Sequence, residues 1–191
     1  MFTSAEAIRR SLLALGEKVS RSGHAPICVL ICGGSALNLS GLITRTTEDV
    51  DALGVASGPL EIEPLPEWLI QCAEEVAAEL GLEEEWFNDA ASVLKNLGFP
   101  EGIMKRAWRE TFGEAFEVAV ASRLDLIAMK CLAALDPKSG RKHLEDLVDL
   151  VPAEDELSFA QAWLFARPTS PQFRQAFAQL CLVLGYSLDA A

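Results

Sequence analysis

The chain is poor in positive charge, in histidine and in paired cysteines, and each shortage excludes a class of function. Its 16 Lys and Arg residues face 28 Asp and Glu residues, which leaves a formal net charge of −12 over 191 residues. A protein that follows a nucleic-acid backbone needs clustered Lys and Arg to neutralise phosphates, so this balance argues against extended DNA binding. A local basic pocket for one end of a substrate stays compatible with the composition.

Histidine and cysteine usage argues against a zinc site and a disulfide framework. The two histidines stand at no suitable spacing from a cysteine, and the five cysteines include no Cys-x-x-Cys pair. Each cysteine sits among apolar residues, as in the run Ile27–Cys32, so we expect reduced, buried thiols. No apolar run approaches the roughly 18 residues that cross a bilayer, and no secretory signal is recognisable. We therefore expect a cytoplasmic protein without membrane association.

Apolar patterning predicts alternating helices and strands, followed by a helical C-terminal half. Half of the residues are apolar, which is enough for a sizeable core in one domain or slightly more. Amphipathic runs are typical of helices, and short continuous apolar runs are typical of buried strands. In chain order we expect a helix over 3–21, a strand over 27–32, a helix over 35–42, a strand over 50–55, a helix over 66–80 and a strand over 116–120. Four further helices are predicted over 123–135, 142–150, 154–166 and 171–184.

This order indicates an α+β fold, with a small mixed sheet flanked by helices and a helical C-terminal half. We place the core in residues 1–122 and expect the helical region of residues 123–191 to pack on it. Within the core, residues 83–100 fit either a helix or an irregular lid. In that segment Trp86 and Asn88 fit a nucleobase pocket, although an aromatic residue at such spacing fits the core as well.

The most informative pattern joins a glycine bend to a pair of carboxylates. Gly33 and Gly34 follow the run Ile27–Cys32, and Asp49 and Asp51 stand one residue apart at the start of the next apolar run. Side chains alternate along a strand, so the two carboxylates are expected on one face, where they repel each other. A hard cation such as Mg²⁺ relieves that repulsion and commonly works with substrate phosphates. The bend supplies backbone N–H groups for those phosphates.

Nearby polar residues extend this predicted site for a metal and a nucleoside triphosphate. Ser35 either donates its hydroxyl to a phosphate or caps the helix that follows. Arg45 either reaches a phosphate, locks the carboxylate segment or is an ordinary surface arginine, and Thr47 orients the turn. The alternative interpretation of Asp49 and Asp51 is a solvated acidic turn that leads into a strand.

The run 33–53 resembles the signature of the DNA polymerase β-like nucleotidyltransferase superfamily. That signature has Gly, then Gly or Ser, a spacer, and Asp-apolar-Asp or Glu; Gly34, Ser35, Asp49 and Asp51 match it. The Arg-x-Thr that precedes the carboxylates is similar to the version found in small bacterial nucleotidyltransferase-like proteins, which include the AbiEii-type toxins.

Later segments resemble further blocks of the same group, in the same order. They are Trp86–Asp89, Arg123–Lys130 and Leu144–Leu150, so the resemblance covers residues 25–150. It implies a Mg²⁺- or Mn²⁺-dependent enzyme that moves a nucleoside monophosphate from an NTP to a hydroxyl acceptor on RNA (such as tRNA), on a protein or on a small molecule. Because the group includes toxins of toxin–antitoxin pairs, a growth-inhibiting role with an antitoxin as partner is a further expectation.

The resemblance also implies a third carboxylate and a lysine later in the chain. Glu117 fits the apolar-acid-apolar pattern of a third metal ligand, or it is a solvent-facing edge residue. Without a third acid, the chain is a weakened or non-catalytic nucleotide-binding module. Lys130 stands mid-helix in an apolar setting and is expected to snorkel outward, to meet a phosphate or to meet a carboxylate. Asp146 pairs with it or acts as a base, and the alternative is a structural ion pair between two helices.

A third interpretation is an acidic interaction protein that assembles through its C-terminal helices. The apolar stripe Phe173, Phe177, Leu180 and Leu184 would then form the contact surface. We take the enzyme as the first hypothesis, the non-catalytic binding module as the second and the assembly protein as the third.

Overall fold

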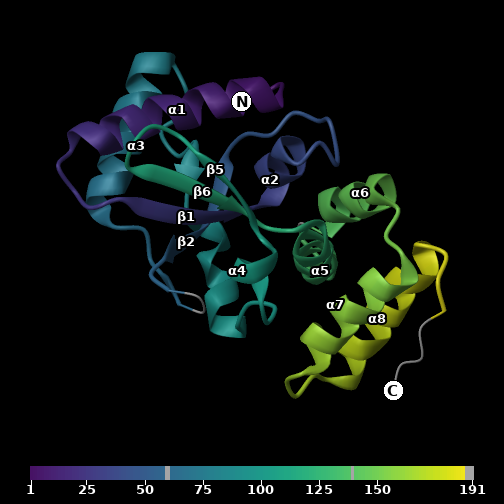
Figure 1. Ribbon diagram of the computed structural model, residues 1–191. Coiled ribbons are helices and arrows are strands. Elements are labelled where there is room, and N and C mark those ends of the chain that lie inside the picture. The colour runs from purple at the N-terminus through teal and green to yellow at the C-terminus, as the bar shows by residue number, and fades with distance from the viewer. Residues whose placement is uncertain (59–60, 139, 188–191) are drawn as a thin grey trace. The chain divides into compact units, whose positions relative to one another are not determined.

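The fold is α+β, with one mixed six-stranded sheet. The computed structural model describes residues 1–58, 61–138 and 140–187 and divides into two compact units, residues 1–122 and 123–191 (Figure 1). The first unit holds the sheet with the helices that cover it, and the second is helical. No helix within the described ranges combines the length and the apolar character that a bilayer span requires.

The first unit contains most of the predicted elements and several that the sequence pattern does not predict. Its elements in chain order are α1 (Ala5–Arg21), β1 (Ile27–Cys32), α2 (Gly33–Leu39), β2 (Val50–Ala56), β3 (Ile62–Glu63), α3 (Glu67–Leu80), β4 (Phe87–Asn88), the 3₁₀ helix η1 (Ala90–Leu97), α4 (Ile103–Arg106), β5 (Trp108–Thr111) and β6 (Phe116–Val120). The predicted helices over 3–21 and 66–80 and the strands over 27–32, 50–55 and 116–120 are confirmed to within about two residues at each end.

The sheet runs in the order β3-β2-β1-β6-β5, and β4 pairs with β2. β1 lies in its middle, antiparallel to β2 and parallel to β6. The central residues Val29, Leu30 and Ile31 are fully buried. A continuous apolar run suits this place because a central strand is covered on both faces.

The segment 83–100 is not one continuous helix. It begins with a turn, continues as the two-residue strand β4 and ends in η1. Trp86 is 1% exposed, and its indole N–H donates to the Ala73 carbonyl at 2.8 Å. Its ring therefore belongs to the core, and the expectation of a nucleobase pocket around it is wrong.

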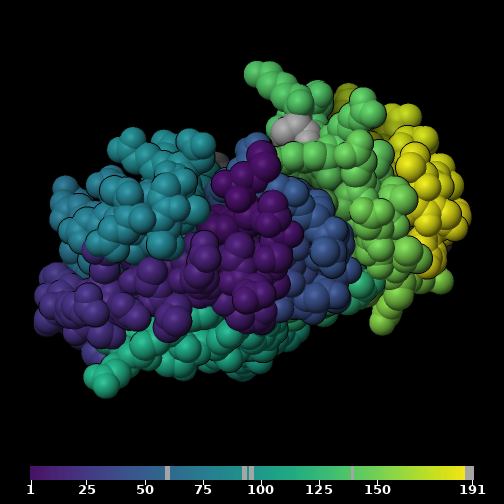
Figure 2. All heavy atoms as spheres, turned by 90° about the horizontal axis from the view of Figure 1, so that it is seen from above, coloured from purple at the N-terminus to yellow at the C-terminus, as the bar shows by residue number. Residues whose placement is uncertain are grey.

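α1 and α3 lie on one side of the sheet, and α4 lies on the other (Figure 1). Figure 2 looks onto α1 and shows it running between the segment of α3 and the segment of α2. α1 begins after Ser4, whose hydroxyl accepts a hydrogen bond from the Ala7 N–H group at 3.2 Å. Its buried stripe includes Ile8, Leu12, Leu15 and Val19.

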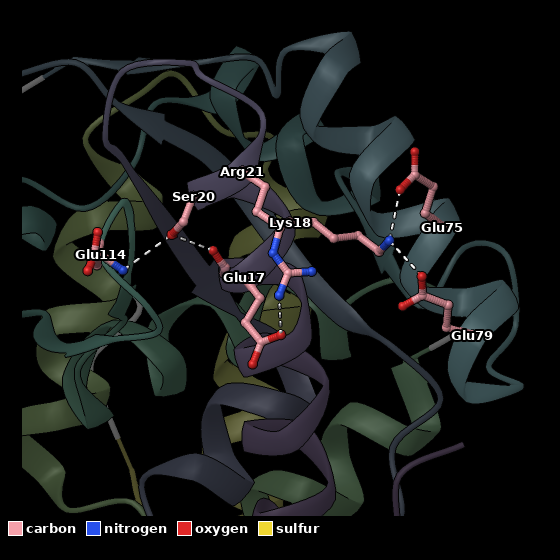
Figure 3. A network of polar contacts seen from close by, with 8 residues as sticks. Glu17, Lys18, Ser20, Arg21, Glu75, Glu79 and Glu114 are labelled. Atoms are coloured by element: carbon pink, nitrogen blue, oxygen red, sulfur yellow. Dashed lines mark hydrogen bonds and ion pairs between the residues drawn. The ribbon is translucent and has the colours of Figure 1, made fainter.

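Lys18 joins α1 to α3 at the surface (Figure 3). Its ammonium nitrogen lies 2.8 Å from a carboxylate oxygen of Glu75 and 2.8 Å from one of Glu79. Close by, the Ser20 hydroxyl accepts a hydrogen bond from the Glu114 N–H group at 3.3 Å. Exposed ion pairs contribute about 0–1 kcal/mol, so the buried apolar stripe supplies most of the stabilisation between these helices.

The second unit consists of α5 (Arg123–Ala134), α6 (Gly140–Leu150), α7 (Glu154–Phe165) and α8 (Pro171–Val183). These are the four predicted C-terminal helices, and their bounds agree to within about two residues. Arg123 at the start of α5 contacts Glu156 through Nε at 2.8 Å and donates to the Leu150 carbonyl at 2.9 Å. It thereby ties the C-terminal end of α6 to α7.

The aromatic stripe of α8 packs inside the second unit. Phe177 is 1% exposed and Leu180 is 7% exposed. The Phe165 ring meets the Phe177 ring edge-on, with centroids 5.6 Å apart, and it meets the Phe173 ring at 6.5 Å. Phe177 and Leu180 therefore belong to the core of their own unit, which argues against the expectation that this stripe is an assembly surface, whereas Phe173 and Leu184 are half-buried.

Candidate functional site

The chain passes from β1 into α2 at Gly33, which has a φ of 72°. Residues with a Cβ rarely adopt this left-handed conformation. The last residue of β1 pairs with Asp51 of β2, so the Asp51 carboxylate reaches the bend. Its Oδ2 atom lies where a Cβ at position 33 would be placed. Glycine is therefore needed here both for the backbone and for the approach of the carboxylate.

Gly34 leaves the same kind of room for Arg45 and Thr47. A Cβ at this position would lie 2.8 Å from Thr47 Oγ1 and 3.1 Å from Arg45 Nη2. The guanidinium and the hydroxyl thus reach the first turn of α2 from the segment before β2. Gly33, Gly34, Arg45, Thr47 and Asp51, all predicted from the sequence, are brought together at the end of β1.

Asn38 holds this arrangement, and the sequence-based prediction missed it. Its side chain is 5% exposed. Nδ2 donates to the Gly34 carbonyl at 3.0 Å and to the Arg45 carbonyl at 2.9 Å, and Oδ1 accepts from the Arg45 N–H group at 3.3 Å. A signal was available, since asparagine has low helix propensity and stands here within an apolar helical run.

Ser35 and Thr47, two residues of the predicted nucleotide site, are buried and bond to the backbone. Ser35 is fully buried, and its hydroxyl donates to the Cys32 carbonyl at 3.2 Å. The N-cap of α2 is Cys32, so the predicted capping role of Ser35 is wrong. Thr47 exchanges backbone hydrogen bonds with Phe2 at 2.6 and 3.0 Å, and its hydroxyl donates to the Asp49 carbonyl at 3.4 Å. Thr47 thus fixes the turn ahead of the aspartates.

Asp49 lies one residue before β2 and contacts a different neighbour from Asp51. Asn88 Nδ2 donates to Asp49 Oδ2 at 3.3 Å. Asn88 also pairs in register with Asp51 in the parallel ladder between β4 and β2. Both aspartates are half-buried. Asp51 therefore lies against the β1–α2 bend, and Asp49 is held by β4.

Glu117 is not brought to the aspartates, which corrects its prediction as a third metal ligand. It pairs with Cys28 across β1 and β6, whereas Asp51 pairs with the last residue of β1. Four residues of extended chain separate these levels, a distance on the order of 13 Å. Its carboxylate instead contacts Arg109 Nη1 at 2.6 Å. At the Asp51 end of β1, the β6 side of the sheet presents Ala119–Ala121, which include no acid.

In the second unit, Lys130 and Asp146 form a buried ion pair between α5 and α6. Lys130 Nζ lies 2.6 Å from Asp146 Oδ2, and the two side chains are 7% and 3% exposed. His143 Nδ1 lies 3.3 Å from the same nitrogen. The predicted pairing of Lys130 with Asp146 is thus present. A buried pair of this kind holds its helices in register because each charge needs the other.

The donor set at β2 fits a cation that arrives with phosphates. Within residues 1–58, 61–138 and 140–187, no three His, Cys, Asp or Glu side chains gather in a way that would hold a metal. Asp51 offers a carboxylate beside Gly33, and Asp49 offers a second one at Asn88. Mg²⁺ is commonly bound through one or two carboxylates together with substrate phosphates, whereas all-protein cages are unusual for it.

Comparisons with protein-family models, with curated proteins and with solved structures find no match for this chain. Its function is therefore inferred from its own residues and their geometry. The strongest element of that geometry is the meeting of Asp51, Arg45 and the glycine bend.

Proposed function

We propose that the chain binds a nucleoside triphosphate with Mg²⁺ or Mn²⁺ at the β1–α2 bend and transfers its nucleoside monophosphate to a hydroxyl acceptor. The observation that carries this proposal is the close approach of the Asp51 carboxylate to Gly33. A carboxylate beside a glycine bend puts a cation ligand and backbone N–H donors within reach of one triphosphate. The resemblance of run 33–53 to the nucleotidyltransferase signature gives further support.

The side chains of the site have different parts in this reaction. Asp49 and Asp51 would hold the cation, which neutralises phosphate charge and makes an attacking hydroxyl more acidic. Arg45, whose backbone is held by Asn38, would contact a phosphate through its guanidinium. The acceptor oxygen forms a bond to the α-phosphorus, the bond to pyrophosphate breaks, and the hydroxyl proton leaves to a carboxylate or to water.

The fold type and the biological role rest on the resemblance. A mixed sheet that carries the β1–α2–β2 unit is compatible with a nucleotidyltransferase-type core. The acceptor would be RNA, a protein side chain or a small molecule, and the role that of a toxin held in check by an antitoxin. Lys130 and Asp146 need no chemical part to account for their contact, since a buried tie between α5 and α6 explains it.

One observation favours a second candidate, a nucleotide-binding module without catalysis. The β6 side of the site presents Ala119–Ala121, so the third acid expected of an active enzyme has no counterpart there. Two carboxylates suffice for one cation with a nucleotide. Binding and catalysis therefore require separate tests.

Binding is tested by thermal unfolding with Mg²⁺ and each of the four NTPs in turn. A ligand at one hundred times its Kd stabilises the folded state by about 2.7 kcal/mol. We therefore expect at least one nucleotide to raise the melting point. Asp51→Asn should abolish the rise, whereas Glu117→Gln is the matched control and should keep it. A rise that Asp51→Asn leaves intact would refute this site.

Catalysis is tested by incorporation of label from an α-³²P NTP into purified RNA or protein acceptors. The enzyme predicts incorporation that Asp49→Ala abolishes and Glu117→Gln preserves. Binding without incorporation into any acceptor would select the non-catalytic module.

A further inference from the structure

The side-chain amide of Asn88 meets three partners at once. Its Nδ2 donates to Asp49 Oδ2 at 3.3 Å and to the Glu85 carbonyl at 3.1 Å. Its Oδ1 accepts from the Ala90 N–H group at 2.9 Å. Only the NH₂ group can face two acceptor oxygens, and only the amide oxygen can face an N–H group, so these partners fix the orientation of the amide.

The backbone around Asn88 is anchored on both sides. The Val50 N–H group donates to the Trp86 carbonyl at 2.6 Å, and Asn88 lies level with Asp51 in the ladder between β4 and β2. Trp86 is itself buried in the core. Strand pairing therefore holds Asn88 level with Asp51, and from there its amide supplies a neutral donor to the Asp49 carboxylate.

We propose that Asn88 is a positioning residue of the cation site, which orients the Asp49 carboxylate through its Nδ2–H group. The nature of the ligand rests on the proposed function, but the contact itself does not. A neutral donor to Asp49 stabilises its carboxylate without a cation, so the site takes up a cation mainly in company with nucleotide phosphates. An acid at position 88 would instead demand a cation.

The competing explanation is that Asn88 only stabilises the turn from β4 into η1. Its Oδ1 bond to the Ala90 N–H group is a local turn contact that asparagine and aspartate make equally well. Asn88→Asp therefore separates the two roles. It keeps the acceptor for Ala90, but it turns the donor that faces Asp49 and Glu85 into a second acceptor with a like charge.

The first measurement is thermal unfolding of Asn88→Asp in metal-free buffer and with Mn²⁺ alone. Loss of a hydrogen bond to a charged group should lower the melting point of a chain of this size by roughly 5 °C. We expect Mn²⁺ to recover at least half of that loss and to leave the wild type nearly unchanged. Ala90→Asp, which adds the same charge at an exposed neighbouring position, should show neither effect. Wild-type melting of Asn88→Asp, with no Mn²⁺ response, would overturn the proposal.

The second measurement is binding of a non-hydrolysable NTP with Mn²⁺, followed by the electron paramagnetic resonance of free Mn²⁺. Asn88→Ala should weaken binding about tenfold, as expected for losing one hydrogen bond to a charged group. The exchange variant Asp49→Asn/Asn88→Asp restores a donor–acceptor pair at the same net charge and should melt above Asn88→Asp in metal-free buffer. An exchange variant no more stable than Asn88→Asp would count against the contact.

The two proposals fail in different ways. If the wild type binds no Mn²⁺–nucleotide while Asn88→Asp gains its Mn²⁺ response, the proposed function falls and the positioning role stands. If the wild type binds Mn²⁺–nucleotide with the affinity of Asn88→Ala, and Asn88→Asp ignores Mn²⁺, the positioning role falls and the proposed function stands.

Discussion

The Oδ2 atom of Asp51 fills the space that a side chain at Gly33 would need. The bend and the carboxylate are therefore one feature, because the same absent Cβ permits the left-handed backbone and the approach of the acid. Nothing in the local sequence around Asp51 shows this dependence, since it arises from the pairing of β1 with β2.

Gly33→Ala should cost both backbone strain and displacement of Asp51. The left-handed conformation costs an alanine about 1–2 kcal/mol, and overlap with a packed group adds about 1–3 kcal/mol. We expect a loss of about 3 kcal/mol in the free energy of unfolding, measured in urea. Gly41→Ala is the control, since Gly41 has a φ of 65° with no atom within 4 Å of the added carbon. A similar loss in both variants would show that the Asp51 side chain moves away from position 33 without lowering the free energy of unfolding.

Substitutions in the buried pair Lys130–Asp146, which joins α5 to α6, should change stability more than substitutions in an exposed pair on α6. Removing one partner of a buried pair costs about 3–5 kcal/mol, so Lys130→Met and Asp146→Asn should each be strongly destabilising. Lys130→Met/Asp146→Leu, which leaves no isolated charge, should cost much less than the sum. Arg141 and Glu145 form an exposed pair at 3.2 Å on α6, and Glu145→Gln should change stability by less than about 0.5 kcal/mol. Additive losses at 130 and 146 would mean that the two charges do not depend on each other.

Val151 connects α6 to α7 in a conformation that suits glycine. Its φ is 47°, and its side chain is 72% exposed. Glycine relieves the left-handed strain at this position, but it also raises the conformational entropy of the unfolded chain. The net effect should make Val151→Gly more stable by about 0.5–1 kcal/mol. Val148→Gly, at a 53% exposed position within α6, should instead lose about 0.5 kcal/mol. Urea unfolding of both variants checks the sign, and a loss at Val151 would show that its side chain makes a favourable contact.

The elements that could be predicted from the sequence are those that local apolar runs stabilise. β1 is an uninterrupted apolar run, so its sequence predicts a buried central strand. β5 has the sequence Trp-Arg-Glu-Thr with half-buried and exposed residues in alternation, and it is a strand because β6 pairs with it. Edge strands of this kind depend on a neighbour that no local pattern contains.

The difference between local patterns and strand pairing also separates the confirmed parts of the site from the corrected ones. The bend and Asp51 meet because they stand at the adjoining ends of β1 and β2, and the sequence order alone suggests this. Glu117 was correctly assigned to a strand, but register decides which end of the sheet it occupies, and register belongs to pairs of strands. The contact of Asn88 with Asp49 depends on the two-residue pairing of β4, for which the sequence offers no signal.

The thiols of the second unit predict a loss of stability in alkali. Burial raises the pKa of Cys181 to about 11 and raises the pKa of Cys131 further above its ordinary value. Above the ordinary thiol pKa near 8.5, the unfolded chain releases these protons while the folded chain keeps them. Unfolding then releases protons, so the free energy of unfolding falls as pH rises.

This contribution is fully present below about pH 8.5 and is lost progressively toward pH 11, at up to about 1.4 kcal/mol per pH unit for each thiol. Urea unfolding at pH 8, 9 and 10 measures how steeply the free energy of unfolding falls with pH. Cys181→Ala should reduce this slope by the contribution of one thiol. Cys72→Ala is the control, because Cys72 is only half-buried and burial raises its pKa less. An unchanged slope in Cys181→Ala would mean that this thiol ionises in the folded protein as readily as in the unfolded chain.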